Sequence, residues 1–259
     1  MFYRQPRYFT AMLRRSLSAL ILASGLFSAA YAEEGFYYLS PQAVSFNIPA
    51  APAPVAAARP AAYLTQAQLQ INDFPAPPAA GSAEDKADLA AVLQWQKVRT
   101  QDQCDAALAQ SDESFISFFS SVTPFQKPLP AAVATFFKRV GANATDANQY
   151  IKKIYKRDRP FLRSAALNPC LGRAQGFSYP SGHAGMSHLF GLVLSDLLPR
   201  QGAIFMREAD QAALNRVIGG VHHPSDVEAG KKLGDRLYKE LLKNPVFVSD
   251  MQGLSAYFR

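Results

Sequence analysis

The stretch YPSGHAGMSHLFGLVLSDLL spans residues 179–198 and joins a turn to a mainly apolar run. The run from Gly182 to Leu198 predicts a helix, and Ser181 is suited to cap it because its side-chain oxygen can accept from the first free N–H groups. Gly182 lets the backbone approach a ligand closely, and the start of a helix attracts anions. His183 would then lie at the edge of an anion site. The alternative is a plain capped turn with an incidental histidine.

Most of the chain after residue 81 shows the same helical spacing of apolar residues, and the alternation typical of strands is nearly absent. Further helices are expected to begin near residues 82 and 111 and to cover residues 128–140, 145–157, 207–218 and 225–243. The sequence therefore predicts an all-α fold, with a single helical bundle domain over residues 82–259. An extended, Pro/Ala-rich N-terminal segment, residues 33–81, would precede it, because such composition is typical of connectors.

The first 32 residues have the organisation of a secretory signal peptide. Four arginines precede an apolar run from Leu17 to Phe27, and Ala30 and Ala32 supply small residues before a cleavage point after Ala32. A membrane anchor is the rival interpretation, but the apolar run is shorter than the roughly 20 residues that a spanning helix needs. Export predicts a periplasmic or secreted protein.

Net charge and hydropathy bear on nucleic-acid and membrane binding, and the two cysteines bear on a disulfide. The formal charge is +7, and loss of the leader's arginines would reduce it to +3, so charge does not argue for nucleic-acid binding. No later stretch approaches a transmembrane helix, which predicts no stable membrane insertion after signal cleavage. An oxidising compartment favours a disulfide between Cys104 and Cys170, with two buried free thiols as the alternative.

Two further segments carry residues suited to binding or attacking an anion. Lys152 and Arg159 are seven residues apart, which on one helix would place both on the same face. Taken alone, this pair is more simply explained as two solvated surface cations. In NRVIGGVHHPSD, residues 215–226, Asp226 follows His222 by four positions. On one helical turn the carboxylate can hold one ring nitrogen and leave the other as a nucleophile. Arg216 can fork onto phosphate oxygens. The alternative is a histidine–aspartate pair that only caps a helix.

The three segments occur in a fixed order: Lys-x6-Arg-Pro, then Pro-Ser-Gly-His, then Arg-x5-His-x3-Asp. In this order and spacing the chain resembles the type-2 phosphatidic acid phosphatase superfamily. The signal peptide and the lack of membrane helices make the bacterial class A non-specific acid phosphatases the most similar subgroup. The resemblance covers roughly residues 80–245. Asn215 departs from the family pattern, which usually has serine before the arginine, but asparagine keeps the capacity to form hydrogen bonds.

The resemblance implies a hydrolase, namely an acid phosphatase that splits phosphomonoesters through a phosphohistidine intermediate. His222 would be the nucleophile, Asp226 its carboxylate partner and His183 the proton donor. The phosphate would be bound by Lys152, Arg159, Ser181, Gly182 and Arg216. No cofactor is expected, since these cations would repel a metal and no zinc-binding spacing occurs. The need for one neutral and one protonated histidine predicts a pH optimum on the acid side of neutral.

Other functions stay open from the sequence: a lipid phosphatase, a vanadium haloperoxidase, or a non-catalytic phosphate-binding protein. The expected partner is a small phosphomonoester, whereas the physiological substrate, phosphotransfer to other acceptors and a homo-oligomeric state are left undecided. His188 is interpreted as a packed helix residue, and His223 as part of the pocket wall or as a structural residue. Arg157 and Arg163 are interpreted as solvated or rim cations.

Overall fold

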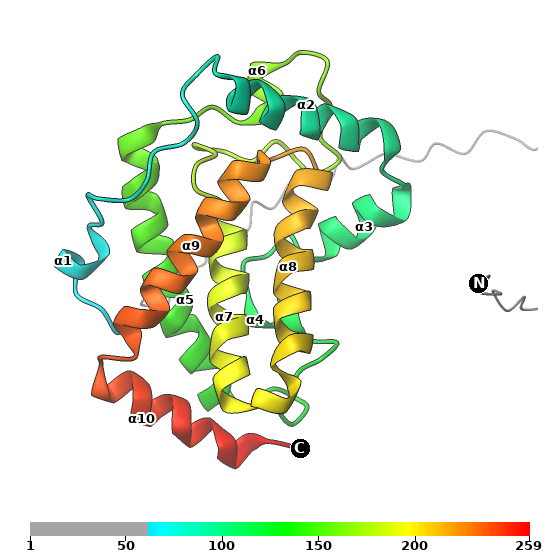
Figure 1. Ribbon diagram of the computed structural model, residues 1–259. Helices are drawn as coiled ribbons and strands as arrows, with labels where there is room; N and C mark the ends of the chain where they lie inside the picture. The colour runs from blue at the N-terminus through cyan, green and yellow to red at the C-terminus, as the bar shows by residue number, and fades with distance from the viewer. Residues whose placement is uncertain (1–61) are drawn as a thin grey trace, which may run out of the picture. The chain divides into compact units, whose positions relative to one another are not determined.

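The computed structural model describes residues 62–259, so the predicted signal peptide and residues 33–61 of the predicted N-terminal segment lie outside the described residues. Over residues 62–259 the chain forms helices and no strand, with one isolated β-bridge between Phe125 and Phe258. The predicted all-α fold is confirmed (Figure 1). The helices are α1 (Gln66–Leu69), α2 (Ala83–Val98), α3 (Gln101–Ala109), α4 (Phe115–Phe119), α5 (Ala131–Tyr155), α6 (Pro160–Arg163), α7 (Gly182–Leu197), α8 (Gly202–Ile218), α9 (Pro224–Leu241) and α10 (Pro245–Gly253).

Helix α7 lies at the centre of the bundle and packs against α5, α8 and α9 (Figure 1). Most of its side chains are buried, as expected for a helix that is apolar nearly all round. It can approach α9 closely because Gly230 has no side chain; a Cβ at this position would overlap the Ser181 carbonyl oxygen. At the same end the Ser181 N–H donates to the Asp226 carbonyl oxygen over 2.9 Å. This contact brings the capped start of α7 beside the first turn of α9.

Helix α5 is continuous where the spacing predicts two helices separated near residues 141–144. Gly141 normally weakens a helix interior by about 1 kcal/mol. Here the cost is offset, because Val140, Ala144 and Ala147 of the same helix are buried in the core. The missing side chain also gives room to α7, since a Cβ on Gly141 would lie 3.4 Å from Met186 and Phe190. The single long helix carries Lys152 in its last turn.

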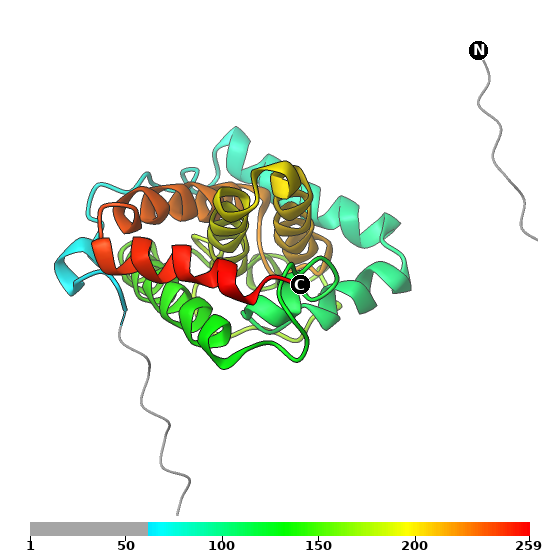
Figure 2. The same cartoon turned by 90° about the horizontal axis from the view of Figure 1, so that it is seen from below.

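Residues 62–81 lie mostly outside helices but contribute to the core. Tyr63, Leu64, Leu69, Ile71 and Phe74 are buried and belong to the main apolar cluster. Helix α10 crosses the end of the bundle opposite α2 and α6, as Figure 2 shows from below. In the part of the chain that the structure describes, no helix has the length and apolar character to cross a bilayer.

Candidate active site

A cavity of about 230 Å³ opens between α5, α7, α8 and the loops beside them. The predicted site residues that line it are Lys152, Arg159, Gly182, His183, Arg216 and His222. Ser181 and Asp226 do not reach its surface; both are completely buried behind the wall. The structure thus brings together three segments that lie far apart in the sequence. Most of the predicted residues face the cavity, and Ser181 and Asp226 lie behind them.

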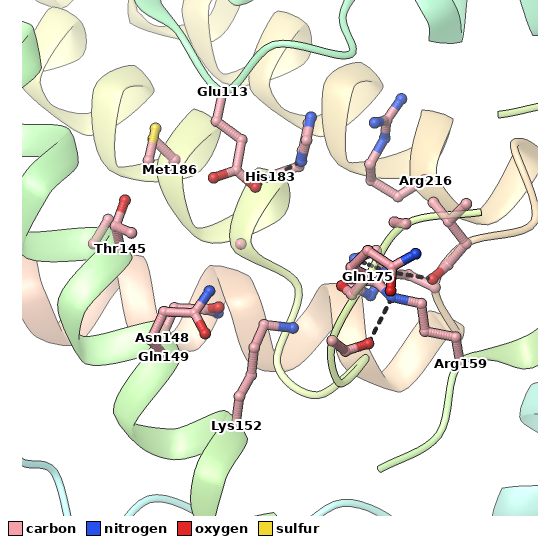
Figure 3. A pocket seen from close by; sticks show the side chains of 16 residues that line it. Glu113, Thr145, Asn148, Gln149, Lys152, Arg159, Gln175, His183, Met186 and Arg216 are labelled. Atoms are coloured by element: carbon pink, nitrogen blue, oxygen red, sulfur yellow. Dashed lines mark hydrogen bonds and ion pairs between the residues drawn. The ribbon is translucent and has the colours of Figure 1, made fainter. Parts of the chain in front are cut away.

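Three cations face this cavity from different elements (Figure 3). Lys152 comes from the last turn of α5, Arg159 precedes α6, and Arg216 lies in the last turn of α8. Burial and the charge of Arg159 lower the pKa of Lys152 to about 7. Burial also lowers the pKa of Arg216 to about 10, and it lowers that of Arg159. The cavity therefore concentrates positive charge in a place where water compensates it poorly.

The idea that Lys152 and Arg159 project from one helix is wrong. Helix α5 ends at Tyr155, and Lys156 takes a left-handed backbone conformation with φ of 47° that turns the chain. Arg159 is the residue before Pro160, which starts α6. Its guanidinium is held by the carbonyl oxygens of Gln175, Gly176 and Val221, each 3.0 Å away. The two cations meet through tertiary structure and not through helical periodicity.

The start of α7 forms another part of the cavity wall. The Ser181 side-chain oxygen accepts from the Ala184 N–H, which confirms its expected role as the helix cap. This bond leaves the N–H groups of Gly182 and His183 at the cavity end of the helix, where the positive end of the helix dipole favours an anion. A Cβ on Gly182 would lie 2.9 Å from Glu113 Oε1, so a larger residue would push this carboxylate aside.

His183 has acceptors on both ring nitrogens. Its Nδ1 lies 2.8 Å from Glu113 Oε1, and its Nε2 lies 2.8 Å from the Ser111 carbonyl oxygen. A carboxylate and a carbonyl can only accept, so both ring nitrogens act as donors when both bonds form, which is the protonated imidazolium. Burial would raise the pKa of Glu113, but His183, Lys152 and Arg216 hold it below its ordinary value. Glu113 could not be predicted from the sequence, because nothing local distinguishes it from other acidic residues near a helix start.

His222 presents one ring nitrogen to the cavity as an acceptor. Its Nε2 lies 3.3 Å from Arg159 Nη1, a group that can only donate. The Nε2 atom therefore carries a lone pair, and the ring proton is on Nδ1, which lies 3.5 Å from Asp226 Oδ2. Burial, with the charges of Arg159 and Lys152, lowers the pKa of His222 well below its usual value. The ring is neutral, as a nitrogen nucleophile must be.

Asp226 makes its shortest histidine contact with His223, the residue next to His222. Its Oδ2 lies 2.9 Å from His223 Nδ1 and 2.8 Å from the His223 backbone N–H. The expectation that His222 and Asp226 share a helical turn is wrong, because α9 begins at Pro224 and His223 is its cap. Burial would raise the pKa of Asp226, but its contacts with His222 and His223 keep it well below the ordinary value. The carboxylate is thus ionised beneath both imidazoles.

A buried ion network lies behind Asp226 and was not anticipated. Arg157, interpreted from sequence as a solvated or rim cation, is 8% exposed. It donates to Asp226 Oδ1 over 2.7 Å and to carboxylate oxygens of Asp85 and Asp88 over 3.0 and 2.9 Å. Arg163 donates to Asp85 and lies 2.8 Å from His223 Nε2. This network ties α2 to the carboxylate below His222. No sequence signal indicates it, since Asp85 looks like an ordinary acidic residue in a first helical turn.

A disulfide joins Cys104 in α3 to Cys170 in the loop before α7. The same region supports two of the cavity cations. Arg216 donates to the carbonyl oxygen of Ala107 in α3 over 2.7 Å, and the loop after Cys170 supplies two of the three carbonyl oxygens that hold Arg159. The bond therefore connects the two supports of these side chains.

Part of this chain is similar to proteins of known family. Residues 129–235 match the family model described as the PAP2 superfamily. A non-specific acid phosphatase of Salmonella typhi is 38% identical over 103 residues, which cover 37% of this chain and 40% of that protein. A non-specific acid phosphatase of Providencia stuartii is 31% identical over 111 residues, which cover 41% and 44% of the two chains. The match thus spans less than half the length of either relative.

The fold is shared with a solved structure. A bacterial vanadium-dependent iodoperoxidase superposes with a TM-score of 0.54 at 18% identity, over 70% of this chain and 53% of the other. The family match includes α5, α7, α8 and most of α9, the elements that carry Lys152, His183, Arg216 and Asp226. Over residues 129–235, less than half of its length, the chain is therefore similar to the PAP2 superfamily.

Proposed function

We propose that this protein is an acid phosphatase that hydrolyses phosphomonoesters through a phosphohistidine intermediate, without a metal ion. The observation that carries the proposal is the neutral imidazole of His222, whose Nε2 lone pair lies in a cavity lined by three cations. A nucleophile beside a concentrated positive field fits attack on a phosphoryl group, where most of the rate enhancement comes from positioning and charge stabilisation. The acid phosphatases among the relatives support the same reaction class.

Binding of the substrate would use the charges that the cavity already holds. Lys152, Arg159 and Arg216 would neutralise the phosphate oxygens, and the N–H groups at the start of α7 would donate to one of them. Ser181 would act from behind the wall, because its side-chain oxygen accepts from Ala184 N–H and keeps the helix start in place. The phosphorus atom would thereby be held within reach of His222.

In the first chemical step, Nε2 of His222 would attack phosphorus while the bond from phosphorus to the ester oxygen breaks. His183 would give a proton to the departing oxygen, which leaves as an alcohol. Asp226 would stabilise the positive charge that grows on His222. Water would then attack the phosphohistidine, give a proton to His183 and release inorganic phosphate and free His222. His183 must exchange one of its two acceptors, Glu113 or Ser111, for the leaving oxygen in this cycle.

Metal independence follows from the same charges. A divalent cation would be repelled by Arg159 and Arg216, and the role it plays in other phosphatases would be filled by these side chains. We also place the protein in the periplasm or outside the cell. The signal-peptide pattern and the disulfide between Cys104 and Cys170 support this location, because disulfides persist in oxidising compartments.

The test is the hydrolysis of p-nitrophenyl phosphate by the purified protein, with and without EDTA, in the wild type and in His222→Ala. We expect the variant to lose at least about 10⁴-fold in kcat, and EDTA to leave the wild-type rate unchanged. A matched control is His188→Ala, since His188 pairs with Asp235 outside the cavity. When a reaction with ³²P-labelled substrate is quenched during turnover, an acid-labile label should remain on the wild-type protein only. Equal rates in wild type and His222→Ala would reject the assignment.

A further inference from the structure

We propose that an apolar groove beside the phosphate cavity binds the organic group of the substrate, so that the preferred substrates are phosphomonoesters of uncharged alkyl or aryl alcohols. This inference rests on the proposed function and specifies its substrate class. The groove has a volume of about 270 Å³ and is lined mainly by α4, the first half of α5, and α7. Its apolar walls come from Phe115, Ile116, Leu129, Phe137 and Phe190.

The groove and the cavity adjoin each other. Glu113, Thr145 and Met186 line both of them. Each space is smaller than the roughly 300–1,000 Å³ of a typical ligand pocket. One ligand that spans both would therefore place a phosphate in the cationic part and a small organic group in the apolar part.

The direction of the reaction points the same way. An in-line displacement puts the leaving group opposite the nucleophile. His222 contacts Arg159, and Figure 3 shows Arg159 on the side of the cavity away from Glu113 and Met186. The proton donor His183 is bonded to Glu113 at the junction with the groove. A departing oxygen beside His183 would therefore carry its organic group towards the groove.

The charges of the groove select against polyanionic alcohols. Of the residues that line it, only Glu113 and Lys138 are charged. Glu113 stays ionised, because His183, Lys152 and Arg216 hold its pKa below the ordinary value, and it lies where the leaving group would enter. A second phosphate on the substrate would meet this carboxylate and one lysine, without the cluster of cations that the first phosphate has. Nucleoside diphosphates and sugar bisphosphates should therefore be poor substrates.

The test compares methyl, butyl and hexyl phosphate, whose alkoxide leaving groups are chemically alike. Full burial of a CH₂ group favours binding by about fourfold, so half burial predicts about twofold per CH₂ and roughly 30-fold in kcat/KM from methyl to hexyl phosphate. Ala134→Trp would fill the groove from α5, where Ala134 is partly exposed. It should remove most of this increase while methyl phosphate is still hydrolysed. Ala131→Trp, at an exposed position of the same helix outside the groove lining, should keep the increase.

A second variant guards against a folding defect in Ala134→Trp. Ile116 is 58% exposed at the groove, so Ile116→Lys should reduce the chain-length dependence without disturbing the core. Equal kcat/KM for the three esters in the wild type would overturn the inference and leave the proposed phosphatase function standing. Chain-length dependence that is unchanged in both groove variants would also overturn it. Turnover of none of the esters would reject the proposed function together with this subsite.

Discussion

Arg157 and Arg159 are two residues apart, but their side chains meet opposite surroundings. Arg157 is surrounded by the carboxylates of Asp85, Asp88 and Asp226. Arg159 has backbone carbonyl oxygens and the Nε2 of His222 as its partners. Burial opposes the charge of both, but the carboxylates outweigh it and raise the pKa of Arg157, whereas burial lowers that of Arg159. Both arginines are buried, and only one has had its charge neutralised by the protein.

The partners of a buried cation distinguish a structural role from a binding role. A buried charge that is already paired contributes to the fold, and its partners would be left uncompensated without it. A buried charge with only neutral partners keeps its field for a ligand, which favours an anion in the cavity. The first arginine should therefore control stability and the second should control catalysis.

The largest effect is expected for Arg157→Met, which leaves three carboxylates without their shared cation. Removing one partner of a buried ion pair costs about 3–5 kcal/mol. We expect a loss of this size in the free energy of unfolding, measured by urea denaturation. Lys153→Met, at an exposed position on the last turn of α5, is the control and should change stability very little. A loss below about 1 kcal/mol in Arg157→Met would show that the carboxylates find other partners.

The same substitution at Arg159 should act on activity. Loss of one preorganised donor from an oxyanion site typically costs about 10²–10³-fold in rate. We expect Arg159→Met to lower kcat/KM for p-nitrophenyl phosphate by this factor and to weaken inhibition by inorganic phosphate. Its stability should fall by less than that of Arg157→Met. The division between the two arginines would be reversed if Arg159→Met unfolded the protein while Arg157→Met stayed folded and inactive.

Lys152 should give the cavity a pH dependence that an arginine does not. With a pKa of about 7, Lys152 is cationic below neutral pH and loses its charge as the pH rises. Phosphate binding should therefore weaken above pH 7, with about a tenfold fall in kcat/KM at pH 8 for the free enzyme. Lys152→Arg keeps the charge, so its decline should move to higher pH. The measurement is the ratio of kcat/KM in the variant to kcat/KM in the wild type on one substrate, because this ratio cancels the effect of substrate ionisation. A ratio that is constant from pH 5 to 9 would contradict the expectation.

The smallest effect on activity is expected for Glu113, the carboxylate that lines the cavity. Glu113→Gln keeps the shape but removes the negative charge that lies 2.8 Å from His183 Nδ1. A proton donor matters most for a poor leaving group, so we expect about a fivefold fall in kcat for methyl phosphate and a smaller change for p-nitrophenyl phosphate. Rates for the two substrates in wild type and variant give the comparison. Equal losses for both would indicate that Glu113 only shapes the pocket.

The sequence predicted much of the cavity surface. Lys152, Arg159, Gly182, His183, Arg216 and His222 all reach it, and Ser181 caps α7 as expected. Their spacing was informative because chemistry of this kind needs particular residue types in a particular order. The residues that hold these side chains in place were harder to predict. Asp226 faces His223 more closely than His222, and the partners of Arg157 and His183 come from α2 and from the loop before α4.

The all-α class, the capped start of α7 and most of the ionisable groups that face the cavity could be predicted from the sequence, because helix periodicity, capping and residue chemistry act over a few neighbouring positions. Tertiary structure alone decided that α5 is continuous and that Arg157 is neutralised whereas Arg159 is not. It also decided that Glu113 meets His183 and that an apolar groove adjoins the cations. The physical reason is that burial and electrostatic pairing depend on distances through space between segments far apart in the chain.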